Sequence, residues 1–409
     1  MRNIIIPFFS PISSESIQAE ILSQLALNEE QILSKENYFL GFHPIAGNRY
    51  YLFVGTGGTE NDIKEFIERS KLEPPIILLS YNANNSLPAA MELRSYLNST
   101  NIDANIVHGA LEELSQLLHK WNGFVQIKRK LADCRMGLIG NPSEWLIASE
   151  VDEDEIRKIW GTEIIHIPIE ELIDLENTQL TDKILKYNEK FLKLANEYEV
   201  PPSEVEDAAL VIEKLLQLIQ EYNLNVLTIK CFDLLLKSSI TSCYAMSYLN
   251  DQGIITGCEG DIPSTFTMFL LNILTGQTPF MANVTHVDSQ KNIIYLAHCT
   301  VALGVLETYS ITTHFESRKS VAIRGQFKTP QDVTILKIGG NDLTKWWTTK
   351  GKIIRNLDFT SACRTQIEIS IEKPARYFLE ESLANHHILV LGDHVKTINE
   401  FLNFVLNKL

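Results

Sequence analysis

Short apolar runs alternate with segments of helical spacing along the first two thirds of the chain, and this alternation constrains the fold most. The first apolar runs lie at residues 3–9, 50–54, 75–79 and 104–107. The segments with helical spacing lie at residues 14–27, 61–70, 87–97 and 110–130. Strands that alternate with helices are typical of a parallel sheet covered by helices. The sequence therefore predicts a flavodoxin-like α/β domain over residues 1–132.

A second series of the same kind follows the first. Its strands are expected at residues 134–140, 163–167, 225–230 and 253–257. The longest connection, residues 181–222, contains two helical segments that Pro201 and Pro202 separate. The series ends with an apolar helix that closes at Gly276. This pattern predicts a second parallel-sheet domain of the flavodoxin or Rossmann type over residues 133–276.

Beyond residue 276 the pattern changes to runs in which apolar and polar residues alternate. These runs lie at residues 292–297, 320–324, 332–337 and 366–371, and a last helix is expected at 397–409. A period of two is typical of antiparallel strands with one buried face. The third domain, residues 277–409, is therefore predicted to be β-rich. The fold class as a whole is α/β, with two parallel-sheet domains followed by a β-rich domain.

Composition and charge exclude several classes of protein. Hydrophobic residues make up 45% of the 409 residues and charged residues 21%, which is typical of a globular protein. We expect no membrane partner, because no apolar run approaches the roughly 20 residues that span a bilayer. A net charge of −15 without a Lys/Arg cluster argues against nucleic acid as a partner. Six cysteines without a CxxC pair, and no signal-peptide pattern, favour reduced thiols and a cytoplasmic location.

Polar and aromatic residues follow three of the strands predicted for the second domain. The three segments are Asn141-Pro-Ser-Glu-Trp145, Cys231-Phe-Asp233 and Cys258-Glu259-Gly260-Asp261. Ligands of open α/β sheets bind beyond the carboxyl ends of the strands, where these segments would meet. Glu259 and Asp261 stand between two apolar segments, so their desolvation needs compensation. Ordinary loops remain the alternative interpretation. The loop at residues 55–60 lacks the glycine spacing and the lysine of phosphate-binding loops, which favours a tight turn.

Histidines are concentrated in the β-rich region. Six of the ten lie there: His286, His298, His314, His386, His387 and His394. Any one of them alone is more often a core or surface residue than a ligand. Carboxylates that face histidines nevertheless describe a metal site, and this donor set suits Mn²⁺, Fe²⁺, Co²⁺ or Zn²⁺ better than Ca²⁺. A divalent cation would also compensate the acids that follow residue 257.

Several motifs stand in the order in which one enzyme family has them. They are GLIGNPSEWLIAS (137–149), CEGDIPSTFTMFLLNILTGQTPFMANVTHVD (258–288), LAHCTVA (296–302), THFES (313–317), CRTQ (363–366) and NHHILVLGD (385–393). Together they resemble the L-fucose/L-arabinose isomerase superfamily, and in particular its shorter fucose-isomerase-like members. The resemblance runs from about residue 134 to residue 409. The first third of the chain matches only in its α/β pattern.

The resemblance implies an isomerase that interconverts an aldose and a ketose, a pentose or a deoxyhexose, by proton transfer through an enediol. It implies a divalent metal, usually Mn²⁺, and a homo-oligomer, a trimer or hexamer, with active sites between subunits. The metal ligands of the family fall on Glu259, Asn283 and His386, although His387 stays open as the histidine. Glu259 and Asp261 are the implied proton carriers, and a metal and a carboxylate are what this chemistry requires.

Asn283 departs from the family pattern, in which an aspartate stands at this position. Asparagine offers a carbonyl oxygen but carries no charge and cannot act as a base. Either the metal is held more weakly, or Asp261, Asp288 or His298 completes the site, or the isomerase activity has been lost or redirected. Trp145, Asn283 and His298 are predicted to line the sugar, although a buried core tryptophan is the alternative for Trp145. Two other functions stay open: a sugar-binding or regulatory protein without turnover, and a metal-dependent sugar lyase or epimerase.

Overall fold

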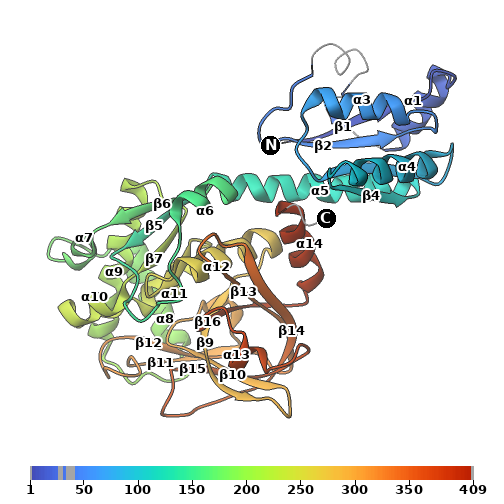
Figure 1. Ribbon diagram of the computed structural model, residues 1–409. Helices are drawn as coiled ribbons and strands as arrows, with labels where there is room; N and C mark the ends of the chain where they lie inside the picture. The colour runs from blue at the N-terminus through green and yellow to red at the C-terminus, as the bar shows by residue number, and fades with distance from the viewer. Residues whose placement is uncertain (1, 26–30, 34–41, 407–409) are drawn as a thin grey trace. The chain divides into compact units, whose positions relative to one another are not determined.

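The computed structural model describes residues 2–25, 31–33 and 42–406, which form two compact units (Figure 1). The first unit comprises residues 1–129 and 401–409, and the second comprises residues 130–400. The boundaries fall within helices α5 (Leu111–Ala132) and α14 (Val395–Val405). The further division that the sequence predicts at residue 276 lies inside the second unit and stays a prediction.

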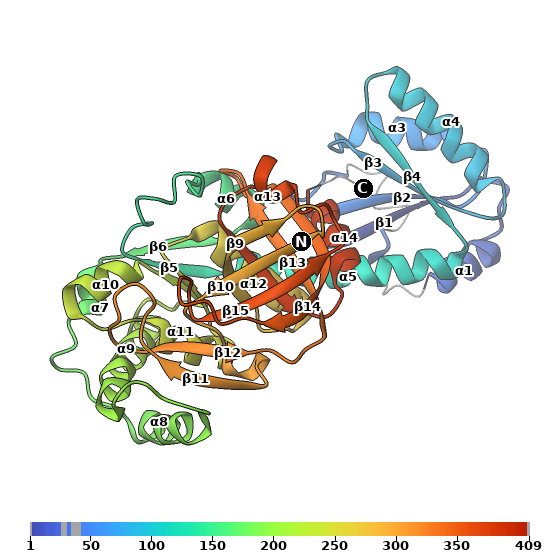
Figure 2. The ribbon, with the colours of Figure 1, turned by 90° about the horizontal axis from the view of Figure 1, so that it is seen from below.

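A four-stranded parallel sheet in the order β1-β2-β3-β4 forms the centre of the first unit. Helices α3 and α4 cover one face and α5 covers the other, as Figure 2 shows. Strands β1 and β3 are buried along their whole length and are therefore almost entirely apolar in sequence. The elements are β1 (Asn3–Phe8), α1 (Glu15–Gln24), β2 (Arg49–Val54), α3 (Glu60–Ser70), β3 (Ile76–Tyr81), α4 (Ser86–Ser99) and β4 (Ala104–Gly109). All four strands lie where the sequence predicts them.

A second parallel sheet, in the order β6-β5-β7-β8, begins the second unit. The chain moves from β5 to β6 on one side and then returns to β7 on the other. The carboxyl ends of β5 and β7 therefore form a topological switch point, which is the usual ligand position in such sheets. The strands are β5 (Arg135–Ile139), β6 (Glu163–Ile167), β7 (Val226–Ile229) and β8 (Ile255–Cys258), again as predicted.

Helices fill the connections of the second sheet. They are α6 (Glu153–Trp160), α7 (Ile169–Ile173), α8 (Asp182–Leu194), α9 (Pro202–Glu221), α10 (Cys231–Ser238) and α11 (Cys243–Asp251). The two helices predicted around Pro201 and Pro202 are confirmed as α8 and α9. Helix α9 begins at Pro202 because a proline in the first turn lacks only an N–H that would have no partner inside the helix.

The β-rich region contains a closed barrel of six antiparallel strands in the order β10-β15-β14-β13-β16-β9. Its strands are β9 (Phe280–Asp288), β10 (Ile293–His298), β13 (Gln331–Gly339), β14 (Lys345–Asn356), β15 (Thr365–Ile371) and β16 (His386–Leu391). A separate hairpin consists of β11 (Thr308–Thr312) and β12 (Ala322–Gln326), and a short helix, α13 (Tyr377–Glu380), precedes β16. The predicted fold class is thus confirmed. The closure of the strands into a barrel is a feature that the sequence does not predict.

Helix α12 (Ile262–Thr275) joins the second sheet to the barrel. It packs against β7 and β8 on one side and against β13 and β16 on the other, so it is apolar nearly all round. Asp261 caps its first turn, a role that the sequence analysis does not assign to it. Gly276 ends the helix in the left-handed conformation (φ 70°), at the residue where the sequence predicts its end. No helix among the described residues has both the length and the apolar character needed to cross a bilayer.

Candidate metal centre

The three segments that follow β5, β7 and β8 meet at one edge of the second sheet, as the sequence predicts. The backbone N–H of Ser143 donates to the carbonyl of Glu259 at 2.9 Å, which joins the first segment to the third. The N–H of Gly260 donates to the carbonyl of Ile229 at 3.0 Å, which joins the third to the end of β7. The edge is therefore built by backbone hydrogen bonds, and Glu259 lies in the middle of it.

Glu259 and Gly260 are two consecutive residues in the left-handed conformation, with φ of 65° and 69°. For the glutamate this conformation costs about 1–2 kcal/mol, because its Cβ crowds the backbone. A Cβ at Gly260 would lie 2.8 Å from the carbonyl oxygen of Asn141. Non-glycine residues in this conformation are found at sites where the surrounding structure over-determines the backbone. The turn holds the Glu259 side chain against the barrel instead of letting it continue the line of β8.

The Glu259 carboxylate is held from two sides and is only 8% exposed. The indole N–H of Trp145 donates to Oε2 at 2.7 Å. Oε1 lies 3.6 Å from Nε2 of His386, which is too long for a direct hydrogen bond. Burial raises the pKa of Glu259, but the contacts with His386 and Trp145 outweigh it and hold the pKa below its ordinary value. Glu259 is thus an anion that lines a cavity.

His386 is the first residue of β16 and is fully buried. Its Nδ1 lies 2.9 Å from Oδ2 of Asp261 and donates the proton, because a carboxylate can only accept. Nε2 has no hydrogen-bond partner among the described residues, although it is buried. Burial lowers the pKa of this imidazole, but Asp261 and Glu259 together raise it to about 9. The 3.6 Å separation from Glu259 suits an ion pair while His386 is protonated, and a cation bound between the two side chains would take the place of the proton at Nε2.

Asp261 lies beneath His386 and is not exposed at all. Its Oδ1 accepts the backbone N–H of Ser264 at 2.9 Å, and Oδ2 accepts the Ser264 hydroxyl at 2.7 Å. Nζ of the fully buried Lys337 donates to the same hydroxyl at 2.8 Å. Burial raises the pKa of Asp261, but Lys337 and His386 prevail and hold it well below its ordinary value. The links Lys337–Ser264–Asp261–His386 form a continuous buried chain that orients the imidazole.

The barrel positions Asn283, His298 and His387 differently. Asn283 lies on β9, opposite His386 of β16 on one side and opposite Ala297 of β10 on the other. Its Oδ1 accepts from Nδ2 of Asn385 at 3.2 Å. His298, at the end of β10, is buried, and its ring centroid lies 5.8 Å from that of His386. His387 follows His386 along β16 and therefore points the other way, where it contacts Tyr377 at 3.2 Å. Of the two adjacent histidines, the structure thus places His386 beside Glu259.

A cavity of about 40 Å³ lies beside Glu259, Asn283 and His298, and His386 is not among the residues that line it. This volume is enough for a cation with one or two waters but far below the roughly 300–1,000 Å³ of a typical ligand pocket. Most of its wall consists of polar and sulfur-bearing side chains. The lining residues are Cys231, Phe232, Leu235, Thr241, Ser242, Cys243, Cys258, Glu259, Asn283, His298, Cys299, His314 and Cys363.

The donor atoms fit a divalent cation. Glu259, Cys258 and His298 each offer one ligand atom, and these three atoms lie within 4.8 Å of one another. Nε2 of His386, 3.6 Å from Oε1 of Glu259, and Asn283, which lines the same cavity, stand beside this group as further donors. Carboxylate oxygen, imidazole nitrogen and amide oxygen are donors that Mn²⁺ and its neighbours accept. Sequence reasoning missed Ser264, Lys337 and the cysteine-rich wall, for which spacing along the chain contains no signal.

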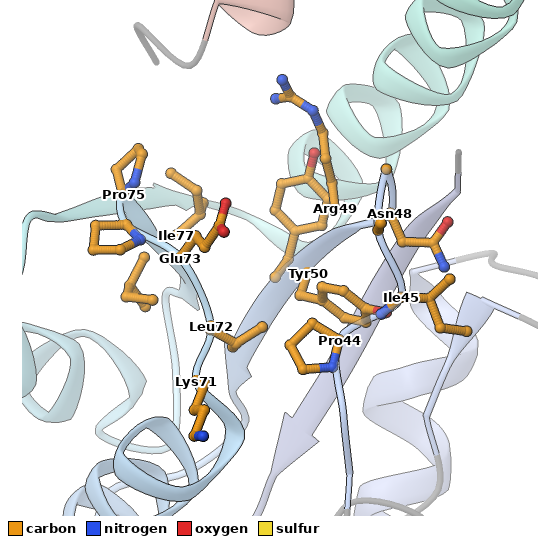
Figure 3. Close-up of a pocket in the computed structure, with 15 residues that line it drawn as sticks. Pro44, Ile45, Asn48, Arg49, Tyr50, Lys71, Leu72, Glu73, Pro75 and Ile77 are labelled. Carbon is orange, nitrogen blue, oxygen red and sulfur yellow. The ribbon is translucent and has the colours of Figure 1, made fainter. Parts of the chain in front are cut away.

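A second cavity, of about 470 Å³, lies in the first unit and is larger (Figure 3). Residues 44–51 and 71–77 line it, at the amino ends of β2 and β3. Ligands of parallel sheets bind at the opposite edge. Its charged side chains, Arg49, Lys71 and Glu73, form no cluster of the acid and histidine kind described above. The larger volume points to the cavity of the first unit as the functional site, whereas the lining side chains point to the smaller cavity of the second unit. We follow the side-chain chemistry and take the smaller cavity as the candidate site.

Comparison with known proteins finds similarity to sulfoquinovose isomerases at 22–23% identity. No protein-family model matches the chain. A sulfoquinovose isomerase of Alkalicoccus urumqiensis is 22% identical over 300 residues, which is 71% of this chain and 66% of that protein. A sulfoquinovose isomerase of Priestia megaterium is 23% identical over 196 residues, which is 46% of this chain and 42% of that protein. One of a Clostridium species is 22% identical over 224 residues, 53% and 50% of the two chains. The chain thus spans between about two fifths and two thirds of the length of these curated relatives.

Proposed function

We propose that this protein is an aldose–ketose isomerase that uses a divalent metal, Mn²⁺ being the first candidate. The observation that carries the proposal is the buried Nε2 of His386, which faces the Glu259 carboxylate 3.6 Å away, within ion-pair range, without a hydrogen-bond partner among the described residues. The sulfoquinovose isomerases to which the chain is similar support the reaction class. Glu259, His386 and Asn283 would hold the metal, and His298 lies close enough to join them.

The accessible and the buried residues of the site have different proposed roles. When bound, the metal would polarise the two oxygens of the substrate between which the proton moves. Glu259 lines the cavity and is held as an anion, so it can take the proton from C2 and return it to C1. The electron pair of the broken C–H bond forms the C1–C2 double bond of the enediol while O1 gains a proton. That pair then forms the new C–H bond at C1 while O2 loses its proton and becomes the ketose carbonyl, so the hydroxyl proton passes in net from O2 to O1. The Trp145 indole fixes Oε2 of this carboxylate.

For Asp261 the geometry supports an orienting role in place of the proton transfer that the sequence suggests. Both of its oxygens accept hydrogen bonds, and the side chain is fully buried behind His386. A carboxylate that accepts the Nδ1 proton of a ligand histidine fixes the ring and makes the other nitrogen a better donor. Asp261 would therefore act on the metal through His386, and substrate would not touch it.

We further propose that a second copy of the chain completes the sugar site, in a trimer or hexamer. The cavity is too small to enclose a sugar, so the substrate has to bind at its open side. Large apolar side chains are exposed on two of the segments that build the site: Trp145 is 53% exposed and Ile147 81% after β5, and Leu236 is 81% exposed on α10. We propose that the second copy covers these side chains.

The test is metal analysis of the purified protein followed by an aldose panel that includes L-fucose, L-arabinose and sulfoquinovose. A ketose product that depends on added Mn²⁺, and that disappears in Glu259→Gln, would support the proposal. Tight sugar binding without any product would favour the second candidate, a sugar-binding protein, which the uncharged Asn283 specifically suggests. A product that keeps the aldose but inverts one centre would indicate an epimerase.

A further inference from the structure

Cysteines are concentrated around the small cavity to a degree that composition does not explain. The chain contains six cysteines in 409 residues, and five of them are among the 13 residues that line this cavity. All six are free thiols, and Cys134 alone lies outside the lining. A wall of this kind needs its own explanation, because a site for a hard cation such as Mn²⁺ has no use for sulfur.

The five thiols form two groups with different surroundings. Cys243 and Cys299 pack with Ala322, Cys363 and Phe315 in an apolar cluster, where a small apolar role explains them. Cys231 and Cys258 lie outside that cluster, at the start of α10 and the end of β8, with their sulfur atoms 3.0 Å apart. Cys258 Sγ is also within 4.8 Å of ligand atoms of Glu259 and His298. All four side chains line the same cavity, and Cys231, which lies outside that 4.8 Å group, adjoins it through Cys258.

We propose that Cys231, Cys258, His298 and Glu259 form a thiolate-containing metal site that takes a thiophilic divalent cation such as Zn²⁺. Two cysteines, a histidine and a carboxylate supply the four donors of a tetrahedral zinc site. With Zn–S bonds of about 2.3 Å the two sulfur atoms would separate from 3.0 Å to about 3.8 Å, a shift that side-chain rotation can provide. Binding releases one proton from each thiol to solvent, and the two thiolates balance the charge of the ion.

His298 is suited to this role by its surroundings. The backbone N–H of Thr300 donates to Nδ1 at 3.4 Å, which leaves Nε2 as the nitrogen for a ligand. Zinc-binding histidines in proteins commonly have their second nitrogen engaged in this way, although usually as a donor. Here Nδ1 accepts, so the proton of the neutral ring is on Nε2. Zinc at Nε2 requires that this proton either leaves the ring or moves to Nδ1, and the move to Nδ1 breaks the contact with Thr300. Because that contact is long and weak, the move to Nδ1 costs less.

The new site shares Glu259 with the Mn²⁺ ligands of the proposed function, so the two ions exclude each other. This consequence rests on the proposed function, whereas the thiolate site itself does not. Zn²⁺ in the thiolate site would draw the Glu259 carboxylate away from His386 and so inhibit an isomerase that needs Mn²⁺. The cavity would then bind either a hard or a soft cation, and the sulfur atoms of Cys231 and Cys258 would favour the soft one.

Co²⁺ is the probe that tests the site, because cobalt bound to thiolate has an intense near-ultraviolet charge-transfer absorption that oxygen and nitrogen ligands do not produce. We expect this band when Co²⁺ is titrated into the whole protein kept reduced with a phosphine, and its loss when Zn²⁺ is added. Cys258→Ser and Cys231→Ser should remove or halve the band and weaken Zn²⁺ binding by at least the roughly 10–100-fold that loss of a residue supporting a ligand causes. Cys134→Ser is the matched control and should retain both. His386→Gln removes a proposed Mn²⁺ ligand and should leave the band in place.

The possible results separate this inference from the proposed function. Co²⁺ binding without the band, or a band that persists undiminished in Cys258→Ser, would overturn the thiolate site. Isomerase activity with Mn²⁺ in a protein that shows no band would overturn it alone. A band that requires Cys231 and Cys258, in a protein that turns over no sugar, would support the thiolate site while the proposed function fails.

Discussion

Asp261→Asn is the substitution that best tests how the centre is built. The asparagine can keep the cap of α12, because its Oδ1 can still accept the Ser264 N–H, and asparagine caps helices as well as aspartate does. The substitution alters the other oxygen, Oδ2. The carboxylate oxygen that accepts from Nδ1 of His386 at 2.9 Å becomes an amide nitrogen, which can only donate. His386 then has to present a lone pair at Nδ1 and carry its proton on Nε2, the atom that faces Glu259.

The expected loss follows from that exchange of protons. Removing the partner that orients a ligand histidine weakens metal binding by about 10–100-fold, which is about 1.4–2.7 kcal/mol of binding free energy. Stability also falls, because the buried Lys337 ammonium loses the anion that compensates it through Ser264, and breaking a buried pair costs about 3–5 kcal/mol. We therefore expect Asp261→Asn to be less stable as well as a weaker binder of Mn²⁺.

A double variant separates the two effects. In Asp261→Asn combined with Lys337→Met the uncompensated charge is gone, so the thermal midpoint should recover while the Mn²⁺ affinity, measured by calorimetry, stays low. Asp251→Asn is the matched control. Asp251 is the last residue of α11 and accepts the backbone N–H groups of Leu303 and Gly304 away from the centre, so its loss should leave Mn²⁺ affinity unchanged. Mn²⁺ affinity in the double variant within twofold of the parent would refute the role of Asp261.

Four other predictions follow from the same geometry. Glu259→Gln should abolish Mn²⁺ retention and any isomerase activity with the fold intact by circular dichroism, and turnover at the parental rate would show that the site is elsewhere. Asn283→Asp should tighten Mn²⁺ binding, since a carboxylate attracts a divalent cation more than a carbonyl dipole does, and equal or weaker affinity by calorimetry would sink this assignment. Gly260→Ala should lower the unfolding free energy by about 1–3 kcal/mol and loosen Mn²⁺ binding, because its Cβ meets backbone at 2.8 Å, whereas Gly253→Ala, also at positive φ but in open space, should keep Mn²⁺ affinity. Analytical ultracentrifugation should find a trimer or hexamer, and an active monomer at micromolar concentration would rule out a site shared between subunits.

The parts of the fold that depend on local pattern could be predicted from the sequence. Each strand of the two parallel sheets is a short apolar run, and each lies where that run predicts it. The same is true of the edge where the site lies, because the carboxyl ends of neighbouring parallel strands must meet. The segments after residues 140, 230 and 257 therefore came together as expected, with Glu259 among them.

What the sequence could not predict depends on contacts between distant segments. Strand β14 mixes lysine, threonine and tryptophan, so its pattern does not show that it closes a barrel with β13 and β15. The partner of His386 is Asp261, 125 residues earlier, and only the docking of α12 on the barrel brings them within 2.9 Å. Burial of Lys337 and the gathering of thiols around Glu259 are likewise products of packing.

The buried link between α12 and β16 has a consequence for how the second unit unfolds. His386 and Asp261 belong to segments that are far apart along the chain and that could open separately, as native proteins commonly do in parts. A cation that binds Glu259, just before α12, and His386, on β16, would bind only while both segments are folded. At a hundred times its dissociation constant it would add about 2.7 kcal/mol to the free energy of opening either segment. Amide hydrogens of α12 and β16 would then exchange together in the metal-bound protein and at different rates without it. The centre would in this way make one cooperative unit of the sheet and the barrel.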